Sequence, residues 1–285
     1  MNKGVVIFAH NNRQTDYARM SMVAAKFASK NLKVPVSLIT DPSTIDWMKE
    51  SNVINEATTI FDKIIITNRP EEINMRNFYD GQDKVAAPFN NGNRSNVWNL
   101  TPYEKTLMID SDFFVMTDTL NNFWDVDCDF MISQKYNDIF GEERTGYHDK
   151  YVSDTGIRLL WATTVMFTKN EYTKMFFDLV EYIKDNYKAF ANLYRFDNRV
   201  YRNDISFSIA HHMLNGFETV NDYALPPVLS ITDKDYLSHT SNDSLIVLVS
   251  EMQNGNYCAA KIDTDIHVMN KQSILRNIDN LMEMA

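Results

Sequence analysis

The chain has 285 residues, of which 44% are hydrophobic, and its 28 basic and 38 acidic side chains give a formal net charge of −10. Its length and apolar content predict a globular protein with a sizeable core, and the acidic balance disfavours a surface built to attract nucleic-acid backbones. Its two cysteines, Cys128 and Cys258, form no CxxC pair, and neither a signal segment nor an apolar run of about 18 residues occurs. We therefore expect a cytoplasmic protein without a disulfide framework or a membrane span.

Short apolar runs alternate with helical patterns near the N-terminus. Residues 4–9 predict a strand, followed by a polar loop and a helix over residues 17–28. Residues 35–40 and 63–67 predict two further strands, with a short helix capped by Ser43 between them. Because each strand is apolar almost throughout, the pattern indicates a mostly parallel sheet with helices on both faces. Ligands of such sheets bind beyond the carboxyl ends of the strands.

Residues 71–101 are rich in Asn, Gly and Pro and predict a long loop with at most short helices. Strands are expected after it at residues 106–109, 113–116, 130–133 and 159–168. The clearest amphipathic helix covers residues 170–190. Its predicted apolar stripe consists of Tyr172, Met175, Phe176, Leu179, Ile183 and Tyr187.

The last part of the chain predicts a helix at residues 203–214, a hairpin and a closing helix at residues 273–284. The hairpin strands, residues 245–250 and 257–262, flank the turn signal Asn254-Gly255. The fold class is therefore α/β, with a Rossmann-like single domain over residues 1–285, a mostly parallel central sheet and a C-terminal hairpin plus helix. Neither a repeat nor a low-complexity linker marks a domain boundary.

Two carboxylates, Asp110 and Asp112, lie between two apolar runs in the stretch TLMIDSDFF. Of five Asp-x-Asp pairs only this one has apolar flanks, where burying a charge costs several kcal/mol, as an order of magnitude, unless it is paired or metal-bound. Mg²⁺ or Mn²⁺ would bind such oxygens and keep positions open for phosphate. The other pairs, 125/127, 127/129, 233/235 and 263/265, are expected to be solvated turns.

Two alternatives remain for this pair. The first is an acidic strand end that faces solvent. The second is an aspartyl phosphatase, whose nucleophile lies in a D-x-D-x-T pattern that closes the first strand. In this chain Phe114 occupies the fifth position, and the pair closes about the fourth strand, so we rank the phosphatase low.

Four sequence blocks support a resemblance to a known group of enzymes. They are FAHNNRQTDY at 8–17, NRSNVWNLTPYEKTLMIDSDFFV at 93–115, WATTVMF at 161–167 with YRNDISFSIA at 201–210, and DIHVMNK at 265–271. In this order they resemble nucleotide-sugar glycosyltransferases of the GT-A fold, nearest in pattern to glycosyltransferase family 8 and to tailed-phage glycosyltransferases. The last block lacks the usual Lys-Pro-Trp ending, and Asn203-Asp204 stands where family 8 more often has Asp-Gln.

The resemblance implies a nucleotide diphosphate sugar, in particular a UDP-sugar, as donor. It implies that Asp110, Asp112 and His267 hold Mn²⁺ or Mg²⁺, a Lewis acid that stabilises the leaving diphosphate. Residues implied to bind the nucleotide-sugar are Ala9, His10, Asn11, Tyr17, Asp41, Arg94, Ser111, Trp161, Thr163 and Lys271.

Catalysis is implied for Asn203 and Asp204, which match the position that contacts the sugar and the acceptor. Family 8 retains the anomeric configuration, so Asp204 would stabilise an oxocarbenium-like transition state; an inverting enzyme would instead use a carboxylate as general base. Structural roles remain open alternatives: a satisfied side chain for His267, surface charge for Arg94 and Lys271, turn chemistry for Asp41, core packing for Trp161, and helix capping for Asn203 and Asp204.

The acceptor is expected to bind the half formed by residues 117–285, opposite a nucleotide-sugar-binding half at residues 1–116. The tailed-phage resemblance implies DNA with hydroxymethylcytosine, in the host cytoplasm, although the acidic chain has no large basic cluster. Arg195, Arg199 and Arg202, interleaved with aromatics in residues 192–202, would contact such a polymer or form an amphipathic connector. A polysaccharide or cell-surface acceptor, or a catalytically silent nucleotide-sugar-binding protein, is the alternative; the complete metal set favours an enzyme.

Overall fold

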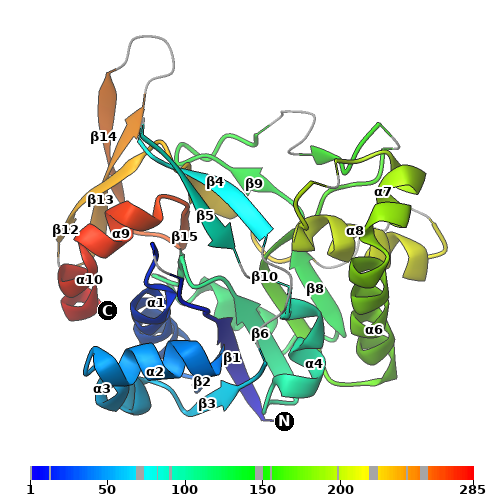
Figure 1. Ribbon diagram of the computed structural model, residues 1–285, viewed down its shortest axis with the longest axis horizontal. Coiled ribbons are helices and arrows are strands. Elements are labelled where there is room, and N and C mark those ends of the chain that lie inside the picture. Colours follow the sequence, from blue (N-terminus) through cyan, green and yellow to red (C-terminus); the bar gives the residue numbers. More distant parts are fainter. Residues whose placement is uncertain are drawn as a thin grey trace.

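The computed structural model shows a central sheet with helices on both of its faces (Figure 1). It describes residues 2–12, 14–68, 74–81, 83–89, 92–144, 150–154, 156–197, 199–217, 224–241, 243–250 and 256–285. Within these residues the central sheet has the strand order β3-β2-β1-β6-β10-β8. These strands are Lys63–Ile66, Val36–Thr40, Lys3–Phe8, Lys105–Ile109, Trp161–Thr168 and Phe130–Ser133.

The first four strands of this order are parallel, and β10 runs antiparallel to both of its neighbours, β6 and β8. The α/β class and the mostly parallel sheet are therefore confirmed. Asp110 follows β6, which is the sixth strand along the chain, not about the fourth as predicted. The carboxylate pair is thus further along the chain from the first strand, where a phosphatase nucleophile is expected.

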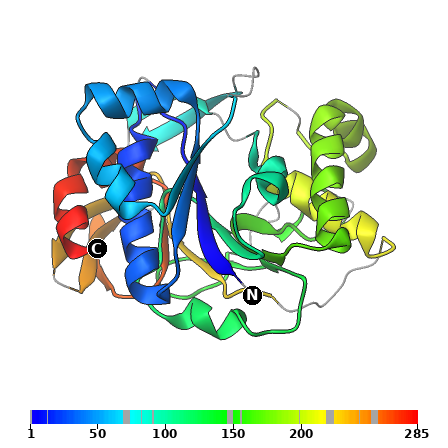
Figure 2. The same ribbon diagram turned by 90° about the horizontal axis from the view of Figure 1, so that it is seen from below.

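Alternate residues of the strands enter two separate cores, as the two-residue period of a strand requires. Val5 and Ile7 pack toward the face covered by α1 (Tyr17–Leu32), whereas Val6 and Phe8 pack toward α6 (Glu171–Asp185) and α8 (Asn203–Leu214). Figure 2 shows the blue N-terminal helices and the green and yellow helices on opposite sides of the sheet. This double cover explains why the strands are apolar almost throughout.

The helix after β2 begins two residues earlier than predicted. α2 spans Pro42–Glu50, and Asp41, not Ser43, is its N-cap: the Asp41 carboxylate accepts from Thr44 N at 2.8 Å. Pro42 decides this position, because proline at the first helical residue lacks an N–H and has a φ suited to the helix. A further helix, α3, spans Ile54–Ile60 before β3.

The long loop predicted for residues 71–101 is wrong over much of its length. β4 (Asn74–Asp80) and β5 (Asp83–Phe89) form an antiparallel hairpin in which Asp80 pairs with Asp83. Gly81 has a φ of +64° in the turn, which favours glycine. The Asp-Gly dipeptide is a hairpin signal, but the flanking residues do not alternate. The expected short helices are present as η1 (Arg94–Asn96) and α4 (Val97–Leu100).

The helix predicted for residues 170–190 is split into α6, capped by Asn170, and α7 (Tyr187–Tyr194). Its predicted stripe is wrong at Met175, whose side chain is 51% exposed, while Phe177, outside that stripe, is buried. Phe177 packs on Phe167 of β10, with ring centroids 4.8 Å apart, and also on Phe207 of α8. Because α6 packs against two neighbours, its buried face is wider than one stripe.

Further strands lie around the central sheet. β7 (Phe113–Phe114), β15 (Ile266–Val268), β11 (Val228–Ile231) and β9 (Tyr136–Asn137) form a second sheet in that order. In it His267 is paired with Phe113, the residue after Asp112. This antiparallel pair brings the end of the chain to the carboxylate pair. The short η2 helix spans Thr119–Phe123.

The C-terminal region contains a three-stranded sheet and two helices. β12 (Tyr236–Ser241), β13 (Ser244–Ser250) and β14 (Tyr257–Ile262) pair antiparallel, and the predicted turn residues 254 and 255 lie outside the described residues. The predicted last helix is two helices, α9 (Lys271–Arg276) and α10 (Ile278–Met284). Within the described residues, no helix combines the length and apolar character needed to cross a membrane.

Candidate active site

A cavity of about 440 Å³ lies beyond the carboxyl ends of β1 and β6, where a ligand of this kind of sheet is expected. Twelve of the residues predicted from the sequence line it: His10, Tyr17, Arg94, Asp110, Ser111, Asp112, Trp161, Thr163, Asn203, Asp204, His267 and Lys271. The other three predicted residues, Ala9, Asn11 and Asp41, do not line it. The cavity therefore unites most of the predicted site from segments far apart in the chain.

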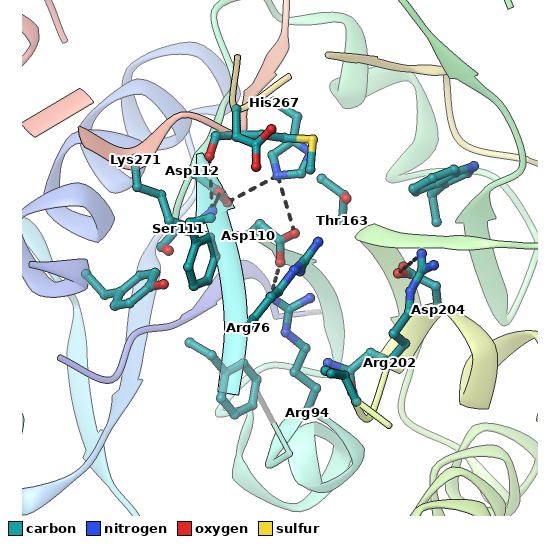
Figure 3. Close-up of a pocket in the computed structure, with 18 of the residues that line it drawn as sticks. Arg76, Arg94, Asp110, Ser111, Asp112, Thr163, Arg202, Asp204, His267 and Lys271 are labelled. Carbon is teal, nitrogen blue, oxygen red and sulfur yellow. Dashed lines mark hydrogen bonds and ion pairs between the residues drawn. The ribbon is translucent and has the colours of Figure 1, made fainter. Parts of the chain in front are cut away.

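Asp110, Asp112 and His267 converge at one end of the cavity (Figure 3). His267 Nε2 lies 3.3 Å from Asp112 Oδ1 and 3.8 Å from Asp110 Oδ2. One ligand atom from each residue lies within 4.8 Å of the other two, which is a spacing that one metal ion can bridge. Two carboxylates and one imidazole suit Mn²⁺ and similar divalent cations.

Two cations hold the remaining carboxylate oxygens. Lys271 Nζ lies 2.7 Å from Asp112 Oδ2, and Arg94 forms an ion pair with Asp110 Oδ1. Each carboxylate therefore turns one oxygen to a cationic side chain and the other to His267. The donor set fits a divalent cation, because the inward oxygens are not those used by Lys271 and Arg94.

The two carboxylates differ in their acidity. Burial raises the pKa of Asp110 above its ordinary value, and the nearby Arg94 guanidinium only partly opposes this shift. Burial acts on Asp112 in the same direction, but Lys271 and His267 together hold its pKa below its ordinary value. Asp112 is therefore the member of the pair that remains ionised most readily.

The loop after β1 places His10, but not its neighbours, in the cavity wall. Asp41 is 0% exposed and lies behind His10, with its Oδ2 3.0 Å from His10 Nδ1. Asn11 Oδ1 accepts from Ala18 N at 2.7 Å and thereby fixes the start of α1. The structure thus gives Asp41 and Asn11 positioning roles, while His10 and Tyr17 reach the cavity.

The Asp41 contacts predict an acid-dependent stability. Burial acts to raise the pKa of Asp41, but the hydrogen bonds from His10, Ser43 and Thr44 outweigh it and hold that pKa below its ordinary value. A lowered folded-state pKa stabilises the fold above the unfolded-state pKa of about 4, and this stabilisation is lost as the pH falls further.

Asp41→Asn should therefore lower the free energy of unfolding by about 1–2 kcal/mol at pH 7, since asparagine keeps the N-cap but removes the charge. The difference from wild type should shrink below about pH 4. Urea unfolding across pH 3 to 7 measures it, with the exposed Asp46→Asn on the same helix as control. A difference independent of pH would contradict the assignment.

Asp204 lies across the cavity from the metal-ligand cluster, at the start of α8. Its Oδ1 accepts from Ala162 N at 2.9 Å, and its Oδ2 lies 3.2 Å from an Arg202 guanidinium nitrogen. The N-cap of α8 is Arg202, and no side chain caps this helix, so the capping role considered for Asn203 and Asp204 is wrong. Asp204 instead joins α8 to the first residues of β10.

Several cavity residues are not apparent from the sequence alone. Arg76 and Phe78 reach the cavity from β4, inside the segment that was expected to be a loop. Tyr136 lies on β9, a strand of two residues that is too short to show a period, and Arg144 follows it in the chain. The Asp80-Gly81 turn was the one local signal that pointed to any of these residues.

The expectation that the other Asp-x-Asp pairs are solvated turns is wrong for three aspartates of two pairs. Asp233 lines the cavity, and Asp235 is 5% exposed and accepts from Thr232 N at 2.7 Å. Asp265 accepts from Thr117 N at 2.8 Å, and burial raises its pKa. These aspartates brace loops, as carboxylates that accept backbone N–H groups commonly do.

The arginines of residues 192–202 are divided between the cavity and the surface. Arg202 lines the cavity, whereas Arg199 is an exposed side chain paired with the neighbouring Asp197. Arg195 is also exposed and ends α7 with a left-handed backbone. Residues 192–202 thus mainly connect two helices, and one of their arginines, Arg202, lines the cavity.

No family model and no curated protein sequence match the chain. Similar solved structures include glycosyltransferase GlyE of Streptococcus pneumoniae TIGR4, at 16% identity over 75% of this chain and 43% of that one, with a TM-score of 0.39. Galactosyltransferase LgtC is 16% identical over 72% of this chain and 69% of its own, with a TM-score of 0.42. Mouse xyloside xylosyltransferase 1 is 10% identical over 75% of this chain and 83% of its own, with a TM-score of 0.45.

The chain thus spans less than half the length of the pneumococcal protein. At these identities and TM-scores, the similarities assign neither a family nor a function.

Proposed function

We propose that this chain is a metal-dependent glycosyltransferase that moves a sugar from a nucleotide diphosphate sugar, a UDP-sugar, to an acceptor hydroxyl. The observation that carries the proposal is the convergence of Asp110, Asp112 and His267 in one cavity with Lys271 and Arg94. A lone Asp-x-Asp pair would not suffice, because the chain has five. The surrounding cations add the chemistry that an anionic donor needs.

The donor chemistry follows from charge. Negative charge grows on the leaving diphosphate as the glycosidic bond breaks. Asp110, Asp112 and His267 would hold Mn²⁺ or Mg²⁺, which when bound supplies Lewis-acid stabilisation of that charge. Lys271 and Arg94 are already aimed into the same space and can donate charge-assisted hydrogen bonds to phosphate oxygens.

The wall at the end of β1 supports binding of the nucleoside. His10, Tyr17 and Ser111 line this part of the cavity, while Ala9 and Asn11 hold the loop from behind. Tyr17 offers an aromatic ring to a base, and Ser111 a hydroxyl to a ribose. Thr163 and Trp161, at the start of β10, are placed to border the donor sugar.

Asp204 is the carboxylate that we assign to the reacting sugar, with Asn203 beside it. Contacts with Ala162 and Arg202 fix its position, so that its charge can stabilise an oxocarbenium-like transition state. This assignment corresponds to retention of configuration. Its support is a fixed carboxylate in the cavity wall, across from the metal-ligand cluster.

The acceptor that we propose is the hydroxymethyl group of hydroxymethylcytosine in DNA. The resemblance of the N-terminal blocks to tailed-phage transferases supports this choice. Arg202 is the member of the predicted arginine segment that lines the cavity and would serve such an acceptor. A polysaccharide or cell-surface glycan is the competing acceptor.

The direct test is to incubate the protein with Mn²⁺ and a panel of UDP- and GDP-sugars, and to measure free nucleoside diphosphate. We expect release from at least one UDP-sugar, reduced at least about 100-fold when a chelator removes the metal. Donor binding without metal-dependent release would instead indicate a silent nucleotide-sugar-binding protein. Comparing DNA that contains hydroxymethylcytosine with unmodified DNA tests the acceptor, since equal, negligible transfer to both would remove the DNA proposal.

A further inference from the structure

An arginine on the acceptor side of the cavity lies on an aromatic stack that the proposed reaction does not use. The rings of Tyr136 and Trp161 are stacked, with centroids 4.3 Å apart and planes 25° apart. The Arg144 guanidinium lies over Tyr136, 5.2 Å from its ring centroid. All three side chains line the cavity, so the stack forms part of its wall.

The stack is built firmly into the fold. The Tyr136 hydroxyl donates to Ser230 Oγ at 2.6 Å, and the side chain is only 5% exposed. Arg144 N donates to Tyr136 O at 2.9 Å, which keeps the arginine above the ring. A guanidinium held against a ring face keeps its in-plane N–H groups available for a planar anion.

Among the described residues, the carboxylates that line the cavity are paired with groups other than Arg144. Three lining carboxylates each have a cation: Asp110 has Arg94, Asp112 has Lys271, and Asp204 has Arg202. The fourth, Asp233, accepts from Tyr79 N at 3.1 Å. Within the part of the chain that the structure describes, no carboxylate lies within ion-pair distance of Arg144.

The stack also adjoins the proposed reacting sugar. Trp161 precedes Ala162, whose N–H donates to Asp204. Among the described residues Arg202 makes one ion pair, with Asp204, and its side chain is 41% exposed, so its other N–H groups can still donate to a ligand.

We infer that Arg144, with Arg202, forms a subsite for an anionic group, phosphate or carboxylate, on the acceptor. The acceptor hydroxyl would lie near Asp204, and the anion would lie over the Tyr136–Trp161 stack. This inference rests on the proposed glycosyl transfer, because that reaction assigns the opposite end of the cavity to the donor diphosphate.

The test uses the full chain with UDP and Mn²⁺ present, and titrates glucose 6-phosphate, glucuronate and glucose by calorimetry. We expect both anions to bind at least about tenfold more tightly than glucose, since charge-assisted hydrogen bonds to a guanidinium contribute this much. Arg144→Gln should remove about tenfold of the affinity for the anions. Arg144→Lys should restore only part of it, because lysine keeps the charge but loses the planar fork.

Arg195→Gln is the matched control, because Arg195 is an exposed arginine of the same half that does not line the cavity. Tight binding of glucose 6-phosphate alone would support the subsite and identify a phosphorylated acceptor; tight binding of both anions would support either source. Equal binding of glucose and the anions, or anion affinity unchanged by Arg144→Gln, would overturn the inference.

Failure of UDP to bind would count against the proposed function separately. The same titrations on the chain alone would then still decide whether anion binding depends on Arg144.

Discussion

Asp112→Asn should lower metal-dependent release of nucleoside diphosphate by about 100-fold to 1000-fold, the largest effect expected at this site. The substitution removes the charge of the carboxylate that ionises more readily of the two, and with it the ion pair to Lys271. Removing one strong electrostatic contact to a transition state typically costs about this much. The readout is nucleoside diphosphate released per minute from the best donor, with and without Mn²⁺.

Folding and metal binding must be separated from catalysis in this experiment. Mn²⁺ should raise the thermal midpoint of the wild-type chain, because a ligand at 100 times its dissociation constant stabilises a fold by about 2.7 kcal/mol. The shift should largely vanish in Asp112→Asn, whose circular dichroism should remain that of the wild type. An equal shift in both proteins would place the metal elsewhere.

The chain supplies its own control for the metal-ligand cluster. Asp127 belongs to two other Asp-x-Asp pairs and is exposed. Asp127→Asn makes the same chemical change on the surface, and its activity and Mn²⁺-induced shift should match those of the wild type. Equal losses in Asp112→Asn and Asp127→Asn would point to a general charge effect.

Phe177→Ala should lower the free energy of unfolding by about 3–5 kcal/mol, the cost typical of emptying a buried phenylalanine site. Phe177 is 2% exposed and contacts the rings of Phe167, Phe176 and Phe207. Phe167 of β10 and Phe207 of α8 contact the ring, so its removal leaves a cavity between these elements. Denaturant unfolding followed by circular dichroism measures the change.

Met175→Ala is the matched substitution on the same helix. Its side chain is 51% exposed, although the apolar stripe predicted from the sequence includes it. The expected change is within about 0.5 kcal/mol, as for most surface substitutions. If Met175→Ala proved as destabilising as Phe177→Ala, the helix would be rotated relative to the arrangement in which Phe177 is buried and Met175 is exposed.

The strands of the central sheet were predictable because their signal is local. A strand buried on both faces must be apolar along most of its length, and β1, β2 and β6 consist mainly of apolar residues. The β4–β5 hairpin lacks such a signal, since its polar and apolar residues do not alternate and its two strands form by pairing with each other. Local periodicity cannot report contacts of that kind.

The candidate site shows the same division. Asp110 and Asp112 are recognisable in the sequence because charged groups beside a buried strand are stable only when they pair with an opposite charge or a metal ion. Nothing near them in the chain identifies the partner: His267 arrives through the β7–β15 pair, and Arg144 through a two-residue strand. Here the sequence resemblance supplied His267, while only the cavity revealed Arg144.

By itself, therefore, the sequence determined the α/β class, the sheet edge where the cavity lies, and the carboxylate pair at that edge, because each depends on neighbouring residues and on burial. Only the tertiary structure decided which side chains face the cavity. In the structure His10, Arg76 and Arg144 line the cavity. Asp41 is buried behind His10 and contacts its ring. The direction of a side chain depends on which distant segments pack beside it, and local sequence does not contain that information.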